Sequence, residues 1–98
     1  NIIYWFWLFE IWFKTLLIIV KYFAWIKDIT SKDSEPINIA EIKDIDELKI
    51  YLVKIYPELK KHFDKNLLRI ALNKEYCYEN TSFNSNDEIA LFPPVSGG

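Results

Sequence analysis

The C-terminal residues Pro93-Pro94-Val95-Ser96-Gly97-Gly98 are the part of the sequence best suited to carry chemistry. Two prolines favour an extended path, which reduces the entropy that is lost when the tail enters a pocket. Gly97 and Gly98 place no side chain beside the last carboxylate, so its acyl carbon can reach the end of a narrow channel and be attacked there. The alternative is a frayed terminus without function. The position directly after the last predicted strand favours chemistry at Gly98.

Cys77 and His62 are two further side chains that could react. Cys77 lies between Glu75 and Glu79, whose charges favour the neutral thiol, so we expect a small apolar role in or near the core. His62 lies near a predicted helix end, where a solvated or capping role is expected. One Cys and one His cannot form a disulfide framework or a four-ligand zinc site. A reducing, cytoplasmic setting is expected.

The charge balance excludes another class of function. The sequence has 98 residues, with 12 Lys+Arg against 14 Asp+Glu and a net charge of -2. Arg69 is the single arginine and the lysines are scattered, so the clustered basic face that binds phosphate backbones is missing. We expect one domain and no nucleic-acid partner.

Residues 1–15, here called the head, differ from the rest of the chain in composition. Ten of the 17 aromatic residues fall in the first 25 positions, together with all 4 tryptophans. Glu10 and Lys14 divide the head into apolar runs far shorter than the roughly 18 uncharged residues expected of a spanning helix. A secretory signal is not expected, because no basic stretch precedes the apolar one. We interpret the head as a hydrophobic, non-native extension and expect no membrane partner.

Hydrophobic patterning predicts an α+β domain over residues 16–98, with one main helix packed on a mixed sheet of four to five strands. The order of elements is strand, strand, helix, strand, strand, strand. The expected strands cover residues 16–25, 36–40, 68–73, 75–78 and 87–92, with a polar turn at residues 29–35.

The main helix has a clear predicted start. Asp44 is the expected N-cap and Glu47 is expected to reach back to the backbone, so we predict no metal site in this acidic cluster. Pro57 should kink or restart the helix near Tyr56, with a further short turn at residues 59–63. The predicted buried face consists of Ile45, Leu48, Leu52, Ile55 and Leu59.

The alternation of the last strand predicts which side chains lie at the root of the tail. Ile89 and Leu91 should point inward, whereas Ala90 and Phe92 point away from the helix. Phe92 would then be an exposed aromatic beside the tail and an anchor for a partner; the alternative is that it folds back on its own core. The same alternation along the other strands places Phe23, Arg69 and Ala71 on the face that points away from the helix.

Two segments carry a resemblance to a known family. Residues 70–76, Ile-Ala-Leu-Asn-Lys-Glu-Tyr, and residues 86–98, from Asn-Asp-Glu-Ile-Ala-Leu-Phe to Pro-Pro-Val-Ser-Gly-Gly, resemble the ubiquitin-like small subunits of molybdopterin synthase, the sulfur carriers of molybdenum cofactor biosynthesis. The resemblance implies a β-grasp fold over residues 16–98 with a flexible tail at residues 93–98. Lys27 stands where this family usually has Arg, and Asn86 where it usually has Gly.

This resemblance also implies a function. Gly98, next to Gly97, is adenylated with ATP by a separate ubiquitin-activating-like adenylyltransferase and then becomes a thiocarboxylate. The large synthase subunit receives the tail in a heterotetramer of two small and two large subunits, and sulfur passes to the pterin precursor to form the dithiolene. The carrier binds no cofactor and is a co-substrate, with the catalytic groups on the large subunit. The implied partner-binding residues are Phe92, Pro93, Pro94, Val95, Ser96, Phe23 and Arg69.

Two other classes of function remain open at this point. The same fold could carry sulfur for thiamine synthesis or tRNA thiolation, or act as a protein modifier. The chain could instead be a membrane-tethered binding module that uses residues 1–15 as its anchor. Cell fractionation separates that last possibility from the others.

Overall fold

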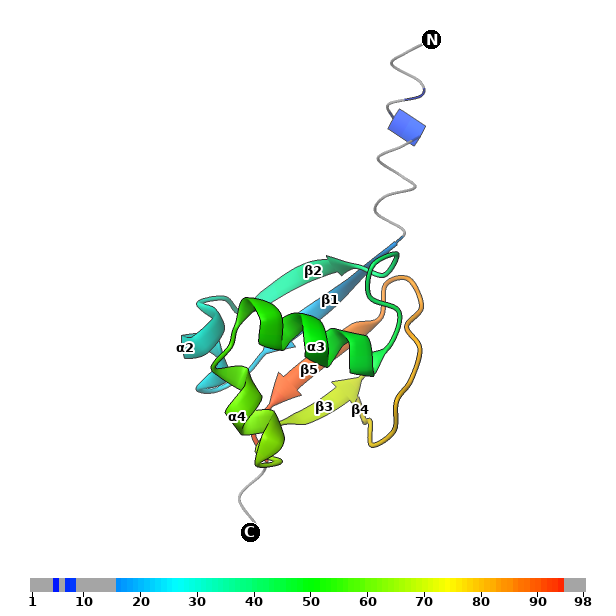
Figure 1. The fold of residues 1–98 in the computed structure, drawn as a ribbon. Coiled ribbons are helices and arrows are strands. Elements are labelled where there is room, and N and C mark those ends of the chain that lie inside the picture. The colour runs from blue at the N-terminus through cyan, green and yellow to red at the C-terminus, as the bar shows by residue number, and fades with distance from the viewer. Residues whose placement is uncertain (1–4, 6, 9–15, 95–98) are drawn as a thin grey trace.

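The computed structural model describes Trp5, Trp7, Leu8 and residues 16–94. A five-stranded mixed sheet with the order β2-β1-β5-β3-β4 carries the main helix α3 across one face (Figure 1). The α+β prediction of one main helix on a mixed sheet is confirmed. The strands are β1 (Leu17–Tyr22), β2 (Ser34–Asn38), β3 (Arg69–Leu72), β4 (Glu75–Tyr76) and β5 (Glu88–Phe92). The helices are α2 (Ile26–Thr30), α3 (Ile45–Ile55) and α4 (Leu59–Asp64).

The two central strands are parallel, which sets where the chain enters and leaves the sheet. β1 pairs with β5 in parallel, from Ile19 opposite Glu88 to Tyr22 opposite Leu91. β2 is antiparallel to β1, and β3 is antiparallel to both β5 and β4. The chain therefore enters β1 at one end of the sheet and leaves β5 at the other end (Figure 1).

The core lies between α3 and the sheet. Alternate residues of β1 and β5 point toward the helix, so their side chains are shielded from water. Burial of each large apolar side chain contributes roughly 1.5–3 kcal/mol to folding. The fully buried apolar residues are Ile18, Val20, Tyr22, Ile26, Leu48, Leu52, Leu59, Ile89 and Leu91.

The first predicted strand, residues 16–25, is too long. β1 ends at Tyr22, and a turn with Ala24 at a positive φ of 56° leads into α2. Ile26 and Thr30, one helical turn apart, are the buried positions of α2. The apolar run was misread because it spans the end of a strand and the start of a helix. The predicted turn at residues 29–35 is wrong at both ends, because α2 extends to Thr30 and β2 begins at Ser34.

The start of α3 is confirmed with one difference. Asp44 accepts a hydrogen bond from the backbone N–H of Glu47 at 2.9 Å, as an N-cap does. The Glu47 carboxylate accepts from the N–H of Lys43 at 2.7 Å, one residue before the position that a capping box uses. Both contacts satisfy donors at the positive end of the helix.

The end of α3 explains one wrong burial prediction. The helix ends at Ile55, and Tyr56 leaves the helical region with φ -129° and ψ 78° ahead of Pro57. Ile55 is therefore 40% exposed instead of buried. The chain turns at Pro57 and continues as α4, whose Leu59 is fully buried as predicted.

Three head residues are described, and they lie away from the sheet (Figure 1). Trp5 is 71% exposed, Trp7 58% and Leu8 37%. Among the residues that the structure describes, no helix has the length and apolar character needed to cross a membrane.

Candidate functional site

The tail starts from the middle of the sheet. β5 lies between β1 and β3 and ends at Phe92, so the chain leaves from a strand that is held on both sides. Pro93 and Pro94 follow and are half-buried. Val95, Ser96, Gly97 and Gly98 lie outside the described residues, so their roles stay predictions.

Three of the predicted partner-binding residues come together at this point. Phe23 follows β1 and donates its backbone N–H to the carbonyl of Leu91 at 3.1 Å. Arg69 of β3 is the register partner of Phe92. Phe92 of β5, Arg69 of β3 and Phe23, directly after β1, are each out of phase with the buried positions of the adjoining strand, so they lie on the sheet face opposite α3.

Phe92 is less exposed than the sequence predicts. Its ring packs against Tyr76 of β4, with 5.6 Å between the ring centroids, and is half-buried. Phe92 is therefore partly covered by a neighbouring side chain on the outward face of the sheet, and it does not fold back on the core. Tyr76 in turn stacks on Tyr78 at 6.0 Å.

Tyr76 and Tyr78 were missed as site residues, although the sequence held a signal for Tyr76. Asn73 and Lys74 have positive φ values of 50° and 71°, which suits a two-residue hairpin turn. Such a turn places Tyr76 opposite Ala71, an outward position. The row formed by Phe92, Tyr76 and Tyr78 is called the aromatic row below; Tyr78 is 83% exposed at its end.

Small side chains lie beneath this row. Ala71 pairs with Ala90 on one side and with Tyr76 on the other. Ala71 was expected to be outward and open; it is on the outward face, but the neighbouring side chains leave it 9% exposed. The flat surface allows the larger rings to approach each other across β3.

Arg69 is held in a fixed position beside the root of the tail. Its Nη1 atom donates to the carbonyl of Asn66 at 2.9 Å, to Asn66 Oδ1 at 3.1 Å and to the carbonyl of Leu68 at 3.3 Å. Asn66 has a positive φ of 57°, a conformation that Asn adopts more readily than most residues. A fixed cation at this place can contact a carboxylate or phosphate of a partner.

The start of β5 is anchored by side-chain hydrogen bonds to the β3–β4 turn. Asn73 Nδ2 donates to Asp87 Oδ1 at 2.9 Å, and Asn73 Oδ1 accepts from the N–H of Glu88 at 2.9 Å. The second Asp87 oxygen accepts from the N–H of Asn84 at 2.7 Å. Asp87 therefore fixes the loop before β5. Asn86 takes a φ of 69°, which suits its place as the substitute for a glycine.

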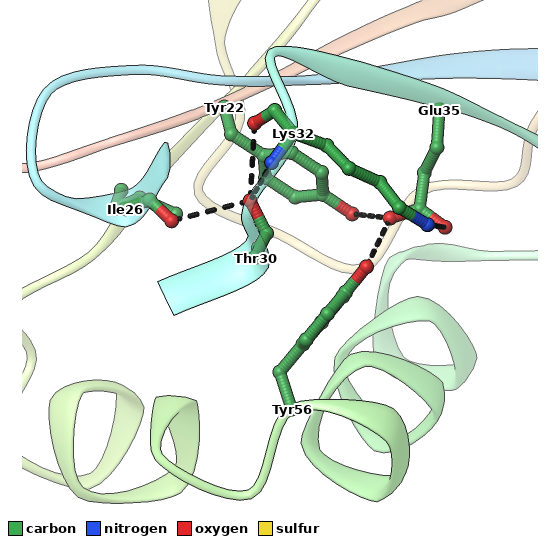
Figure 2. Close-up of polar contacts among 6 residues, drawn as sticks. All are labelled: Tyr22, Ile26, Thr30, Lys32, Glu35 and Tyr56. Atoms are coloured by element: carbon green, nitrogen blue, oxygen red, sulfur yellow. Dashed lines mark hydrogen bonds and ion pairs between the residues drawn. The ribbon is translucent and has the colours of Figure 1, made fainter. Parts of the chain in front are cut away.

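A polar cluster joins Glu35 of β2 to Tyr22 at the end of β1 and to Tyr56 after α3 (Figure 2). Glu35 Oε2 accepts hydrogen bonds from the hydroxyls of Tyr22 at 2.8 Å and Tyr56 at 2.6 Å. Lys32 Nζ lies 3.8 Å from the other oxygen. Burial, followed by the hydrogen bond to Glu35, raises the pKa of Tyr22 well above its ordinary value and that of Tyr56 to about 12. The cluster joins β1, β2 and the end of α3.

Cys77 and His62 contribute nothing to the tail root. The Cys77 thiol donates to the carbonyl of Glu79 at 3.3 Å and packs against the core, as the sequence predicts. The His62 ring lies 4.5 Å from that of Trp25 and is half-buried, so it packs there and is not simply solvated. It lies in the last turn of α4, near a helix end as predicted. Within residues 16–94 and the three described head positions, no three His, Cys, Asp or Glu side chains form a group that could hold a metal ion.

Comparison with known proteins agrees with this geometry. Residues 20–98 match the model of the ThiS family. The chain is 39% identical over 93 residues to a molybdopterin synthase sulfur carrier subunit of Dictyostelium discoideum, which covers 88% of this chain and 95% of the relative.

Solved structures extend the comparison. One chain of a protein–protein complex of subunits 1 and 2 of molybdopterin-converting factor from Helicobacter pylori superposes with a TM-score of 0.63 at 30% identity, over 84% of this chain and 99% of the other. Small archaeal modifier protein SAMP1 from Haloferax volcanii superposes with a TM-score of 0.68 at 24% identity, over 84% and 99% of the two chains. The fold is therefore the β-grasp fold that the resemblance implied.

Proposed function

The chain belongs to the ThiS family and is a sulfur carrier of the molybdopterin synthase small-subunit type, and we propose that it carries the sulfur on Gly98 as a thiocarboxylate. The observation that supports this most strongly is the sequence Pro93-Pro94-Val95-Ser96-Gly97-Gly98 directly after the central strand β5. A tail that starts from a strand held on both sides has a fixed origin, so its last atoms can be aimed into a partner's channel.

The proposed reaction begins at the carboxylate of Gly98. One carboxylate oxygen attacks the α-phosphorus of ATP, pyrophosphate leaves, and an acyl-adenylate forms. A hydrosulfide ion then attacks the acyl carbon and displaces AMP, and loss of its proton leaves the thiocarboxylate. We assign these steps to a separate adenylyltransferase, as in the expected reaction of a carrier, and assign to this chain the roles of platform and substrate.

The sulfur then passes from the thiocarboxylate to the pterin precursor. The thiocarboxylate sulfur is a good nucleophile at neutral pH, so it attacks a carbon of the precursor and displaces an oxygen substituent there. Water then cleaves the acyl C–S bond, which leaves a thiolate on the pterin and the Gly98 carboxylate ready for another cycle. The large synthase subunit supplies the catalytic groups and receives the tail. We assign the docking of that subunit to the outward face around Phe23, Phe92 and Arg69, extended by the aromatic row. Two small and two large subunits complete the proposed heterotetramer.

Chemistry at Gly98 is tested by intact mass. The chain is incubated with ATP, sulfide and a matching adenylyltransferase, and the expected product has one oxygen replaced by sulfur. Deletion of Gly97-Gly98 should abolish the change, whereas Ile50→Ala, on the exposed side of α3, should leave it intact. A sulfur-containing product from the deleted chain would contradict the assignment to Gly98.

A modifier or a carrier for thiamine synthesis or tRNA thiolation is the second candidate. This chain shares its fold with the archaeal modifier protein, and its own Gly97 and Gly98 would serve this candidate function as well. The two candidates differ in what consumes the thiocarboxylate. Stimulation of a molybdopterin synthase large subunit by the thiocarboxylated chain supports the first candidate; its absence, together with transfer to protein lysines or to tRNA, supports the second.

A further inference from the structure

The edge strand β4, seen beside β3 in Figure 1, is two residues long and leaves a hollow at the edge of the sheet. β4 pairs with Ala71 and Leu72, and one further hydrogen bond runs from the N–H of Cys77 to the carbonyl of Ile70. Arg69, the first residue of β3, thus lies beyond the end of β4, and a cavity of about 260 Å³ opens beside it. This cavity, here called the edge hollow, is lined by Lys49 of α3, Asn66, Arg69, Cys77 and Tyr78 together with apolar side chains of the core.

Two cations line the edge hollow without a carboxylate beside them. Within the part of the chain that the structure describes, neither Lys49 nor Arg69 forms an ion pair with Asp or Glu, and no acidic residue lines the hollow. Lys49 Nζ lies 5.9 Å from the centre of the Phe63 ring. The hydrogen bonds of Arg69 to this chain use its Nη1 atom, so its other guanidinium nitrogens are left for a partner. Two positive charges at one cavity favour an anion.

The size of the edge hollow indicates what kind of anion fits. Sites for small molecules and cofactors usually enclose about 300–1,000 Å³, and the edge hollow, at about 260 Å³, lies below this range. It therefore suits one protein side chain better than a cofactor. A carboxylate is the group that matches the planar fork of an arginine. Asp and Glu are the side chains that carry one.

The edge hollow is continuous with the face that we assign to the large synthase subunit. Tyr78 ends the aromatic row and also lines the hollow, and Arg69 is the register partner of Phe92. β4 lies two strand spacings from β5, or about 10 Å. A standard interface covers about 800 Å² of each partner, which is a patch of about 16 Å radius. A patch centred on Phe92 therefore extends past the edge of the sheet and over the hollow.

We propose that the edge hollow receives an Asp or Glu side chain of the large synthase subunit, whose carboxylate lies between Lys49 and Arg69. This inference rests on the proposed function, because it requires that the large subunit docks on the outward face. Contact between apolar rings has little directionality, whereas a charge pair covered by the partner fixes the orientation of the two proteins. The carboxylate thus sets the orientation of the subunit that receives the tail.

The first test measures the Kd for the large subunit by calorimetry at about 50 mM and about 500 mM salt. Lys49→Gln with Arg69→Gln should raise the Kd roughly tenfold at low salt, and the difference from the natural chain should shrink at high salt. Arg69→Lys keeps the charge but loses the planar fork, so its Kd should be intermediate.

The control removes the same amount of charge from outside the edge hollow. Lys54→Gln with Lys61→Gln changes two exposed lysines, on α3 and α4, that do not line it. The Kd of this control should stay within about twofold of the natural value. Urea unfolding checks that each variant is folded. Lys49→Gln alone keeps the test decisive if Arg69→Gln unfolds the chain, because Lys49 forms no hydrogen bond or ion pair with the described residues.

Cys77 provides a second readout, because it is the single cysteine of the chain and lines the edge hollow. A maleimide added to the complex should alkylate Cys77 roughly tenfold more slowly than in the free chain, since the partner side chain fills the hollow. The intact mass of the carrier measures the rate, so cysteines of the large subunit do not interfere.

Four results would overturn the proposal. The double glutamine variant could bind as tightly as the control, or Cys77 could react at the same rate in the saturated complex as in the free chain. Protection of Cys77 by AMP or ATP alone would place a nucleotide phosphate in the edge hollow instead. Absence of binding between the natural chain and the large subunit would remove the partner itself. Formation of the thiocarboxylate at Gly98 is measured without the large subunit, so failure of this inference and failure of the carrier function are distinguishable.

Discussion

Phe92 of β5 and Tyr76 of β4 pack against each other with their ring centroids 5.6 Å apart, although β3 lies between their strands. The contact is possible because Ala71, the register partner of Tyr76, is small. The pair joins the root of the tail to the edge of the sheet, so the proposed docking surface is one continuous apolar area and not an isolated ring.

Phe92→Ala should weaken binding of the large synthase subunit. A half-buried aromatic at the centre of an interface contributes on the order of 2 kcal/mol, so we expect a roughly 30-fold rise in Kd by calorimetry. Ile50→Ala removes an exposed apolar side chain from α3 and serves as the control. Equal affinities for the two variants would contradict the assigned face. Thermal unfolding of both separates lost contacts from lost folding.

Tyr22→Phe should destabilise the domain without changing its shape. The substitution keeps the ring but removes the hydroxyl that donates to Glu35 at 2.8 Å, so the carboxylate loses one of its two tyrosine donors. We expect a loss of about 1–2 kcal/mol in the free energy of unfolding, measured with urea. Tyr78→Phe is the matched control, because Tyr78 is 83% exposed. A loss of the same size in the control would show that the Glu35 contact is not the cause.

The same cluster predicts a fall in stability at high pH. Tyrosine in an unfolded chain loses its proton near pH 10, whereas in the folded protein the pKa of Tyr56 is raised to about 12 and that of Tyr22 is raised further by burial. Above about pH 10 the unfolded chain binds fewer protons than the folded one, so stability decreases as pH rises. Below about pH 10 the contribution is fully present.

Urea unfolding between about pH 8 and about pH 11 measures this dependence. The double variant Tyr22→Phe with Tyr56→Phe should show a shallower decrease than the natural chain, because the two groups that titrate differently in the folded state have been removed. Identical slopes for the two proteins would contradict the prediction. The other tyrosines and the lysines are present in both and cancel in the comparison.

Local signals in the sequence were enough to predict much of the fold and which residues lie at the root of the tail. Asp44 as N-cap and the alternation of β5 depend on neighbours within a few residues, so they could be predicted. The helix α2 could not, because residues 23–26 are apolar enough for a strand and only the packing of Ile26 against the core distinguishes them. Ile55 fits the helical period but lies at the last turn, where the chain leaves the core.

Contacts between segments that are distant in the sequence could not be predicted either. Glu35 meets Tyr22 and Tyr56 across separations of 13 and 21 residues, and no spacing rule links such positions. Tyr76 is an intermediate case. Its outward position follows from the two-residue turn at Asn73 and Lys74, but its contact with Phe92 requires the strand order, in which β5 lies next to β3.

The prolines of the tail should matter for docking and not for folding. Replacing Pro93 and Pro94 with glycine keeps the length of the tail but lets the free tail sample many more conformations, which must be given up on binding. At roughly 0.4–1 kcal/mol for each proline, we expect the affinity for the large subunit to fall roughly fourfold to thirtyfold.

The matched control is Pro36→Gly, which replaces a proline that lies exposed on the edge strand β2, away from the tail. That change should lower the free energy of unfolding and leave the affinity for the large subunit unchanged. The double change in the tail should instead lower the affinity and leave the free energy of unfolding unchanged. Calorimetry and urea unfolding on both proteins measure the two effects. Unchanged affinity for the glycine tail would mean that the prolines do not pre-order the path to Gly98, and that the partner's channel alone orders the tail.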